Sequence, residues 1–191
     1  KDIERGKFAI SNTIAFLDAL GEIQEDIDNF WVSLFEYEMY WSIAKGINLN
    51  SFTFPVFDND DFSIAEFYHP LIKNAVKNSL TVNRNIILLT GPNMAGKSTV
   101  LKSISLCVFL SHIGLAVPAQ SCKMPFYDSF LFSINVNDDI KNGYSSFMNE
   151  IMTLKNIIID LKNGKRCFAL FDELFKGTNI DDSLELMLIT L

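Results

Sequence analysis

The stretch Gly91-Pro92-Asn93-Met94-Ala95-Gly96-Lys97-Ser98 decides the fold of this chain. It matches the phosphate-binding template G-x-x-x-x-G-K-[ST] at every fixed position, and Thr99 follows it. The apolar run 86–90 before the stretch predicts a buried strand, and the residues after it predict a helix over 98–112. This order of strand, glycine-rich loop and helix is the context that the template requires, and it favours a phosphate loop over an ordinary glycine turn.

The residue types of the loop explain what it could bind. Gly91 and Gly96 permit the tight turn that directs backbone N–H groups at one point, where the following helix adds the positive end of its dipole. Lys97 supplies a mobile positive charge for the β- and γ-phosphates of a nucleotide. The Ser98 hydroxyl is a hard oxygen ligand of the kind that Mg²⁺ prefers.

Composition predicts a globular protein with one substantial domain and a small appendage. The chain has 191 residues, of which 49% are hydrophobic and 20% charged. A net charge of −7 argues against a nucleic-acid grip by this chain alone, which needs clustered Lys and Arg, but leaves a small local patch open. No apolar run reaches membrane-spanning length, and no signal peptide is visible.

The three cysteines, Cys107, Cys122 and Cys167, have no metal-binding spacing. Buried thiols in a reducing compartment are the favoured interpretation, so we expect a cytoplasmic protein. The start at Lys1 and the apolar helical pattern that ends at Leu191 lead us to expect a segment of a longer protein.

Residues 1–50 predict helices with a break at Gly21. We expect the second helix to pack on the next element of the chain, with a partner-binding seam as the alternative. Its apolar stripe, which ends at Gly46, consists of Ile27, Phe30, Leu34, Tyr37, Trp41 and Ala44.

Residues 51–191 predict strands that alternate with helices. Before the loop we expect short strands near 52–57 and 64–68, the second ended by His69-Pro70, where His69 has a structural role rather than that of a ligand or base. After the loop we expect strands at 130–136 and 167–171 and helices at 147–162 and from 181. This alternation predicts an α/β fold with a mostly parallel sheet and helices on both faces.

Two adjacent acids, Asp172 and Glu173, end the apolar run 167–171. A carboxylate at the carboxyl end of a buried strand lies at the ligand crevice of an open α/β sheet. We assign Asp172 to Mg²⁺, through water, and Glu173 to the attacking water, because neighbouring acids at a strand end point to opposite sides.

A third cluster, Ser145-Ser146-Phe147-Met148-Asn149-Glu150, predicts only a helix cap when taken alone. Together the three motifs point to a family. The loop, with its Pro92-Asn93-Met94 insert, closely resembles the phosphate loop of the MutS family of DNA mismatch repair ATPases. The cluster is similar to that family's S-T-F-M-x-E segment, and Asp172-Glu173-Leu174-Phe175-Lys176-Gly177-Thr178 is similar to its D-E-[LI]-G-R-G-T. His69-Pro70 and Val117-Pro118-Ala119 also match in place and order.

The resemblance covers 51–191 and implies an ABC-type P-loop NTPase domain that is truncated at its C-terminus. Over 1–50 it rests on helicity and on Leu17-Asp18-Ala19-Leu20, and implies the helical end of the family's core or lever region. ATP binding would join this ATPase domain to a second one, in a homo- or heterodimer, and ATP hydrolysis would separate the two domains. That cycle would gate a clamp around DNA, which is bound mainly by regions outside this chain, and no membrane is involved.

The resemblance also implies a role for each site residue. Lys97 and Glu173 would serve hydrolysis, Ser98 and Asp172 would hold Mg²⁺, and Ser145 would reach the γ-phosphate on the opposite subunit. The residues implied to hold ATP within the subunit are Gly91, Pro92, Asn93, Met94, Ala95, Gly96, Lys97, Ser98 and Thr99.

The chain departs from the family pattern in three places. Phe175 and Lys176 replace the usual Gly and Arg, and Ala75 or Val76 stands where the family places an aromatic residue that stacks on adenine. The chain also ends before the family's switch histidine, so we expect weak hydrolysis by this chain alone. A MutS-like paralogue acting on recombining or branched DNA, and a nucleotide-gated scaffold with little turnover, are the alternatives. A metabolite kinase is least favoured, because no acceptor site is evident.

Overall fold

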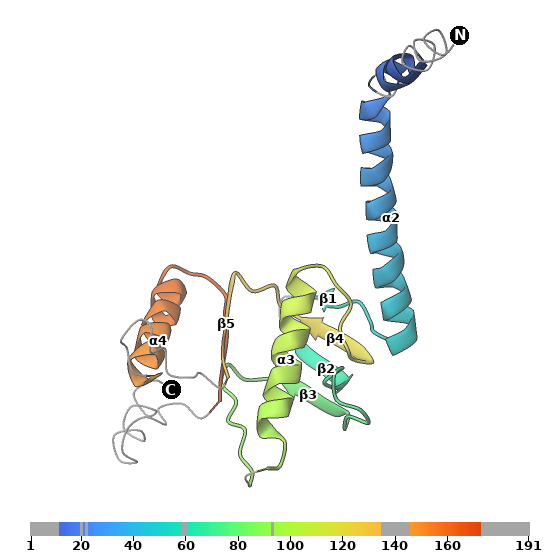
Figure 1. Ribbon diagram of the computed structural model, residues 1–191. Coiled ribbons are helices and arrows are strands. Elements are labelled where there is room, and N and C mark those ends of the chain that lie inside the picture. The colour runs from blue at the N-terminus through green and yellow to red at the C-terminus, as the bar shows by residue number, and fades with distance from the viewer. Residues whose placement is uncertain are drawn as a thin grey trace, which may run out of the picture. The chain divides into compact units, whose positions relative to one another are not determined.

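The structure is a computed structural model that describes residues 12–19, 21, 23–58, 61–92, 94–134 and 146–172 (Figure 1). The chain divides into two compact units, Lys1–Leu49 and Asn50–Leu191. In the described ranges, no helix combines the length and the apolar character needed to cross a membrane.

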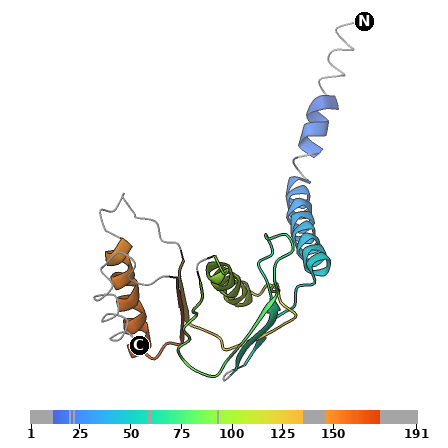
Figure 2. The same ribbon diagram turned by 90° about the horizontal axis from the view of Figure 1, so that it is seen from below.

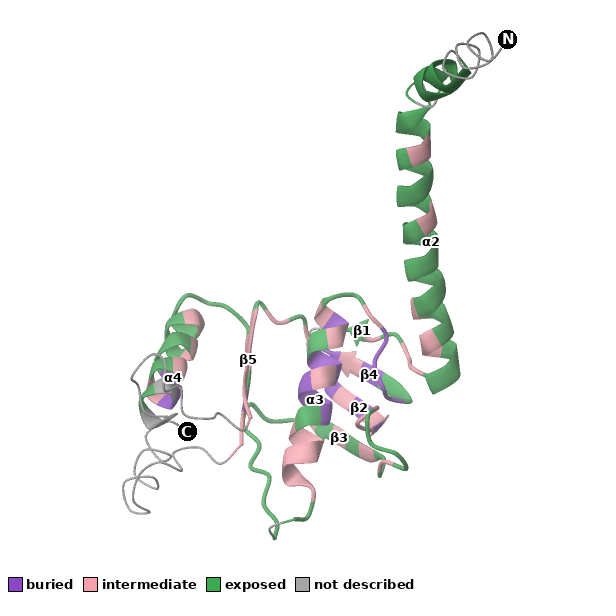
Figure 3. Cartoon of the chain, in the orientation of Figure 1, coloured by how far each residue is buried: buried purple, intermediate pink, exposed green. Residues whose placement is uncertain are grey.

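Helix α2, Gln24–Asn50, makes up most of the described first unit, and none of its residues is buried. Figure 3 shows it exposed along its length, with a few intermediate positions. Trp31 and Phe35 stack on each other, with ring centroids 5.9 Å apart, yet Phe35 is 61% exposed. Within its own unit the apolar stripe of α2 is therefore not buried, and its packing on the next element stays a prediction. The helix also runs on past Gly46 to Asn50.

The second unit begins with a four-stranded sheet in the order β1-β4-β2-β3. Strand β2 is antiparallel to β3 and β4, and β1 is parallel to β4. The larger sheet is thus mixed rather than mostly parallel, because a turn after β2 returns the chain directly into β3. The four strands are β1 (Val56–Phe57), β2 (Phe62–Phe67), β3 (Asn78–Val82) and β4 (Ser121–Met124).

A bulge interrupts β2 between Ile64 and Phe67, which pair with Leu80 and Asn78. Two residues of β2 therefore lie opposite one residue of β3, and Glu66 takes a φ of 50°. Strict alternation from Phe62 and Ile64 would bring Glu66 to the core. The bulge instead buries Phe67 and leaves Glu66 to form a salt bridge of 2.9 Å with Lys77.

A β-α-β unit supplies a second parallel pair of strands. Strands β5, Ser129–Ser133, and β6, Cys167–Phe171, pair in parallel, with Ser133 opposite Phe171. Helix α4, Ser146–Lys162, connects them, as a parallel pair requires. The predicted helix 147–162 and strand 167–171 are confirmed. The predicted strand 130–136 is confirmed as far as Ser133, and Val136 lies outside the described residues.

Helix α3, Lys97–His112, lies between the four-stranded sheet and the β5–β6 pair (Figures 1 and 2). The prediction of a helix over 98–112 is confirmed. Its buried side chains Ile104, Cys107 and Val108 share one hydrophobic core with Phe67 of β2 and Leu170 of β6. Its buried serines, Ser103, Ser105 and Ser111, donate to carbonyl oxygens three or four residues back, which satisfies their hydroxyls inside the core.

Two of the three cysteines are buried, as predicted. Burial raises the pKa of Cys107 to about 12 and that of Cys122 to about 11. Cys167, the first residue of β6, is only partly buried, unlike the other two cysteines.

The predicted buried strand at 86–90 is wrong in this structure. The run forms no strand, and its four large apolar side chains are 47% to 71% exposed. An apolar run of this kind becomes a strand only when a neighbouring strand accepts its backbone hydrogen bonds and both of its faces are covered. Among the described residues no strand pairs with it.

Candidate nucleotide-binding site

The start of α3 has the geometry of an anion site. Gly96 precedes the helix with φ 87° and ψ 12°, a left-handed conformation that favours glycine. The Val100 N–H then donates to the Gly96 carbonyl at 3.0 Å. Among the described residues no side chain caps this helix start, and its first turn holds no acid. Its leading N–H groups and the positive end of its dipole therefore favour a negatively charged ligand.

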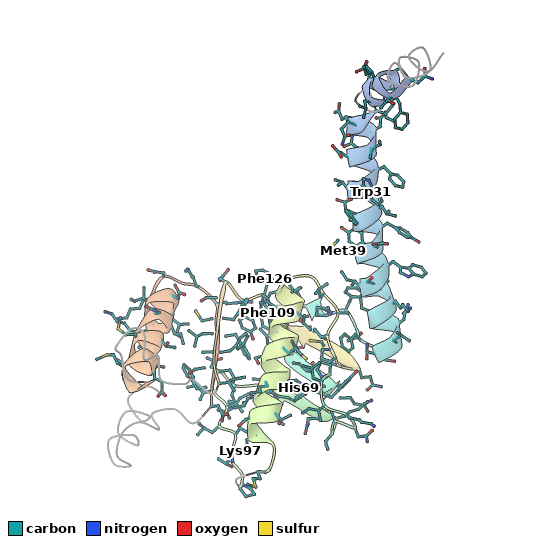
Figure 4. The ribbon with its side chains drawn as sticks, in the orientation of Figure 1. Trp31, Met39, His69, Lys97, Phe109 and Phe126 are labelled. Carbon is teal, nitrogen blue, oxygen red and sulfur yellow. The ribbon has the colours of Figure 1, made fainter. Side chains whose placement is uncertain are left out.

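Lys97 folds back over the loop that precedes it. Its Nζ donates to the carbonyl oxygens of Gly91, at 2.8 Å, and Pro92, at 2.9 Å. The Ala95 N–H also donates to the Pro92 carbonyl, at 3.3 Å, which makes a turn. Figure 4 shows Lys97 at one end of α3, with Phe109 toward the other. The sequence analysis did not predict these contacts. The feature that could have indicated them is the long Lys97 side chain, which follows Gly91 by six residues and Pro92 by five.

The other predicted loop residues divide into an exposed tip and a half-buried helix start. Met94 has a φ of 66° and is fully exposed, whereas Ser98 and Thr99 are half-buried. Asn93 lies outside the described residues, as do Ser145 and Glu173. Their predicted roles stay predictions.

Asp172 directly follows β6, and its N–H donates to the Ser133 carbonyl of β5 at 2.9 Å. The carboxyl ends of β5 and β6 lie at the end of the unit where α3 begins (Figures 1 and 2). Leu170, two residues before Asp172, shares its core with Leu101, three residues after Ser98. One packed body therefore carries both the strand-end acid and the loop.

The donor atoms present suit magnesium. The Ser98 hydroxyl and the Asp172 carboxylate are hard oxygen ligands. Within the described ranges, no group of three or more His, Cys, Asp and Glu side chains is placed to hold a metal ion. A magnesium ion held by these two residues would thus take its remaining oxygen ligands from phosphate and water, which is its usual preference.

Among the described residues, neither histidine belongs to a group of potential metal ligands. His112 Nδ1 bonds to the Val108 carbonyl at 2.7 Å, and its Nε2 accepts from the Tyr127 N–H at 2.9 Å, so both ring nitrogens fix the end of α3. His69 Nδ1 is buried and has no hydrogen-bond partner among the described residues. Val76, considered for the adenine position, is 78% exposed.

A left-handed glycine before an uncapped helix, in a mixed α/β unit, is typical of phosphate-loop proteins. The chain belongs to the MutS family, because the family model "MutS domain V" matches residues 87–189, more than half of the chain.

Individual relatives agree with the family match. The chain is similar to the DNA mismatch repair protein MSH3 of Candida albicans, with 31% identity over 187 residues. It is also similar to the DNA mismatch repair proteins MutS of Bacillus subtilis, with 34% identity over 143 residues, and Lysinibacillus sphaericus, with 32% identity over 178 residues. These alignments cover 85%, 71% and 88% of this chain, respectively, but only 18%, 16% and 21% of the relatives.

Proposed function

We propose that this chain is the ATP-binding and ATP-hydrolysing part of a MutS-family protein that acts in DNA mismatch repair. The observation that carries the proposal is the start of α3, where Gly96 turns the chain into an uncapped helix and Lys97 is the first helical residue. The family match and the relatives' names as DNA mismatch repair proteins support it.

The loop residues from Gly91 to Thr99 hold the phosphates in this proposal, with Lys97 as the mobile charge. Ser98 holds Mg²⁺ directly, and Asp172 holds it through water. The ion, when bound, neutralises charge on the β- and γ-phosphates. Glu173 orients the attacking water, and Ser145 of a second subunit reaches the γ-phosphate.

The wider architecture belongs to the same proposal. Residues 51–191 form an ABC-type P-loop NTPase domain, in which β5 and β6 are a parallel pair beside the loop helix, and 1–50 form the end of a lever region. ATP-driven dimerisation gates a clamp around DNA. The net charge of −7 favours DNA contact through other regions.

The substitution Lys97→Ala tests the site. We expect the affinity for ATP with Mg²⁺ to fall about 10- to 100-fold, because charge-assisted hydrogen bonds to phosphate are lost, and hydrolysis to fall with it. Isothermal titration calorimetry and phosphate release measure the two effects. Lys102→Ala is the matched control, since Lys102 is exposed on the same helix. If Lys97→Ala binds ATP as well as Lys102→Ala does, the phosphates bind elsewhere.

A second candidate function is a MutS-like paralogue that acts on recombining or branched DNA. The departures at Phe175 and Lys176 favour it, because they alter the segment after the catalytic acids. A mismatch-reading domain in the full-length protein would favour repair, and its absence would favour the paralogue. A scaffold with little turnover is disfavoured by the intact Lys97, Asp172 and Glu173, and single-turnover hydrolysis would decide it.

A further inference from the structure

His112, the last residue of α3, is bonded through both of its ring nitrogens. Its Nδ1 lies 2.7 Å from the Val108 carbonyl oxygen, and its Nε2 lies 2.9 Å from the Tyr127 backbone nitrogen. A carbonyl oxygen only accepts and a backbone N–H only donates, so the ring hydrogen is on Nδ1 and Nε2 is an acceptor. His112 thus joins its own helix to the segment 125–128, which connects β4 to β5.

The segment that His112 holds is bonded in turn to the start of β6. Asp128, the residue after Tyr127, donates its N–H to the Arg166 carbonyl at 2.9 Å, and its Oδ2 accepts the Arg166 N–H at 2.8 Å. Arg166 directly precedes β6, and the Tyr127 ring packs on Phe168 within that strand, with centroids 5.2 Å apart. We call this chain of contacts, through His112, Tyr127, Asp128 and Arg166, the His112 brace.

The brace and the candidate site lie at opposite ends of the same two elements. Helix α3 runs from Lys97 to His112, whereas β6 runs from the residue after Arg166 to the residue before Asp172. The 16 residues of α3 span about 24 Å, and Ile104, near the middle, is packed in the core. A helix that is held at its middle and released at one end can tilt, and a tilt moves the other end by a similar distance.

We propose that His112 is a positioning residue, whose brace fixes the phosphate loop at the start of α3 relative to Asp172 at the end of β6. The inference rests on the proposed function, because it concerns the placement of that site's residues. Lys97 and Ser98 move together with α3, so loss of the brace leaves the loop's own contacts with phosphate intact. The span between Ser98 and Asp172 changes instead, and a misplacement of about 1 Å can lower a catalytic rate by about 100-fold.

Two substitutions of His112 separate its hydrogen bonds from its bulk. His112→Phe keeps an aromatic ring but accepts nothing from the Tyr127 N–H, whereas the amide oxygen of His112→Gln can accept it. We expect the Tyr127 N–H to exchange with solvent about 10-fold faster in His112→Phe and at the unsubstituted rate in His112→Gln. Amide hydrogen exchange followed by NMR measures this, and equal rates in all three proteins would overturn the brace.

The distance between two spin labels measures the placement of α3 without nucleotide. One label replaces the exposed Lys102 of α3, and the other replaces the exposed Lys155 of α4, the helix that joins β5 to β6. Cys167→Ser is present throughout, because that thiol is only partly buried. We expect a narrow distance distribution in the unsubstituted chain and in His112→Gln, and a broader one in His112→Phe. An equally narrow distribution in His112→Phe would overturn the proposal.

A second variant of the brace keeps the test decisive if His112→Phe does not fold. Asp128→Ala, at an exposed position, removes the carboxylate that accepts the Arg166 N–H and should broaden the same label distance. Phe57→Leu is the matched control, since it removes a ring 5.4 Å from that of His112 and leaves the hydrogen bonds of the brace in place. Broadening in Phe57→Leu as large as that in His112→Phe would show that ring packing holds α3, and would overturn the brace.

Hydrolysis kinetics separate this inference from the proposed function. In His112→Phe we expect kcat to fall about 10-fold and the Mg²⁺ concentration for half-maximal rate to rise, while KM for ATP stays within about 2-fold. His112→Gln should restore both values. Unchanged kcat and Mg²⁺ requirement in His112→Phe, despite a broadened label distance, would overturn the positioning role while the proposed function stands. If the unsubstituted chain binds no ATP but His112→Phe still broadens the distance, the proposed function fails and the brace stands.

Discussion

Helices α2 and α3 differ in what surrounds their apolar side chains. Helix α3 buries Ile104, Cys107 and Val108 between a sheet and a parallel strand pair, whereas α2, which is rich in aromatic residues, buries none. Yet α2 has the more regular apolar stripe in the sequence. The spacing of apolar residues thus identifies the face that a helix offers for packing, and the flanking elements determine whether that face becomes buried.

The largest difference between the two helices is expected when a charge is placed on each of them. Val108→Asp places a carboxylate at a fully buried position of α3, and we expect a loss of about 3–5 kcal/mol in the free energy of unfolding. Val32→Asp makes the same change on α2, where Val32 is 59% exposed, and should alter stability by no more than about 0.5 kcal/mol. Urea unfolding followed by circular dichroism measures both. Equal losses would mean that α2 is covered in solution.

Alkaline pH should weaken the core around α3. Burial keeps the pKa of Cys107 at about 12 and that of Cys122 at about 11, above the ordinary value of 9.0. Above pH 9 the unfolded thiols ionise while the folded ones stay protonated, so the unfolded state binds fewer protons and stability falls. The expected slope is about 1.4 kcal/mol per pH unit for each thiol, continuing until the pH approaches the folded-state values.

Unfolding midpoints between pH 8 and 10.5 measure this slope. Cys107→Ala removes one of the two buried thiols. The unfolding free energy of this variant should therefore fall less steeply with pH, by the amount that the Cys107 thiol contributes. The difference between the two proteins also removes the contribution of other groups that titrate in alkali. Identical slopes would show that Cys107 ionises as easily in the folded as in the unfolded state.

The smallest expected change in stability comes from the hydrogen bond to the last carbonyl of α2. Tyr68 Oη donates to the Asn50 carbonyl at 2.8 Å, where α2 ends and Ser51 takes a φ of 53°. Tyr68→Phe removes that donor and should cost about 0.5–1.5 kcal/mol. Tyr37→Phe, at a residue 63% exposed within α2, is the control that should change little. Thermal unfolding compares them, and an unaltered Tyr68→Phe would show that water replaces the hydroxyl at no cost.

The parts of the fold that could be predicted from the sequence are those with local causes. The helix after the loop follows from its position behind Gly96, and α4 ends where Gly164 takes a φ of 77°. The run 86–90 could not be placed in the same way, because an apolar strand needs a partner strand that its own sequence does not specify.

For the candidate site, too, the sequence predicts the positions that have local causes and not the contacts that depend on folding. The sequence indicates that Lys97 and Asp172 belong near a loop and a strand end, and in the structure Lys97 begins α3 and Asp172 directly follows β6. It does not indicate which acceptors Lys97 contacts, since the Gly91 and Pro92 carbonyls converge only after the loop has closed. Ser145 and Glu173 lie outside the described residues, so their roles stay predictions.

The extra residue in β2 has a consequence for insertions and deletions in this part of the chain. Ala65 and Glu66 together stand opposite one residue of β3, so removal of either one would leave Ile64 and Phe67 opposite Leu80 and Asn78 in a regular ladder, with both side chains still on the core side. Insertion of a further residue into a regular part of the strand would instead turn the later side chains to the opposite face. This position of β2 should therefore tolerate the loss of one residue better than the rest of the strand.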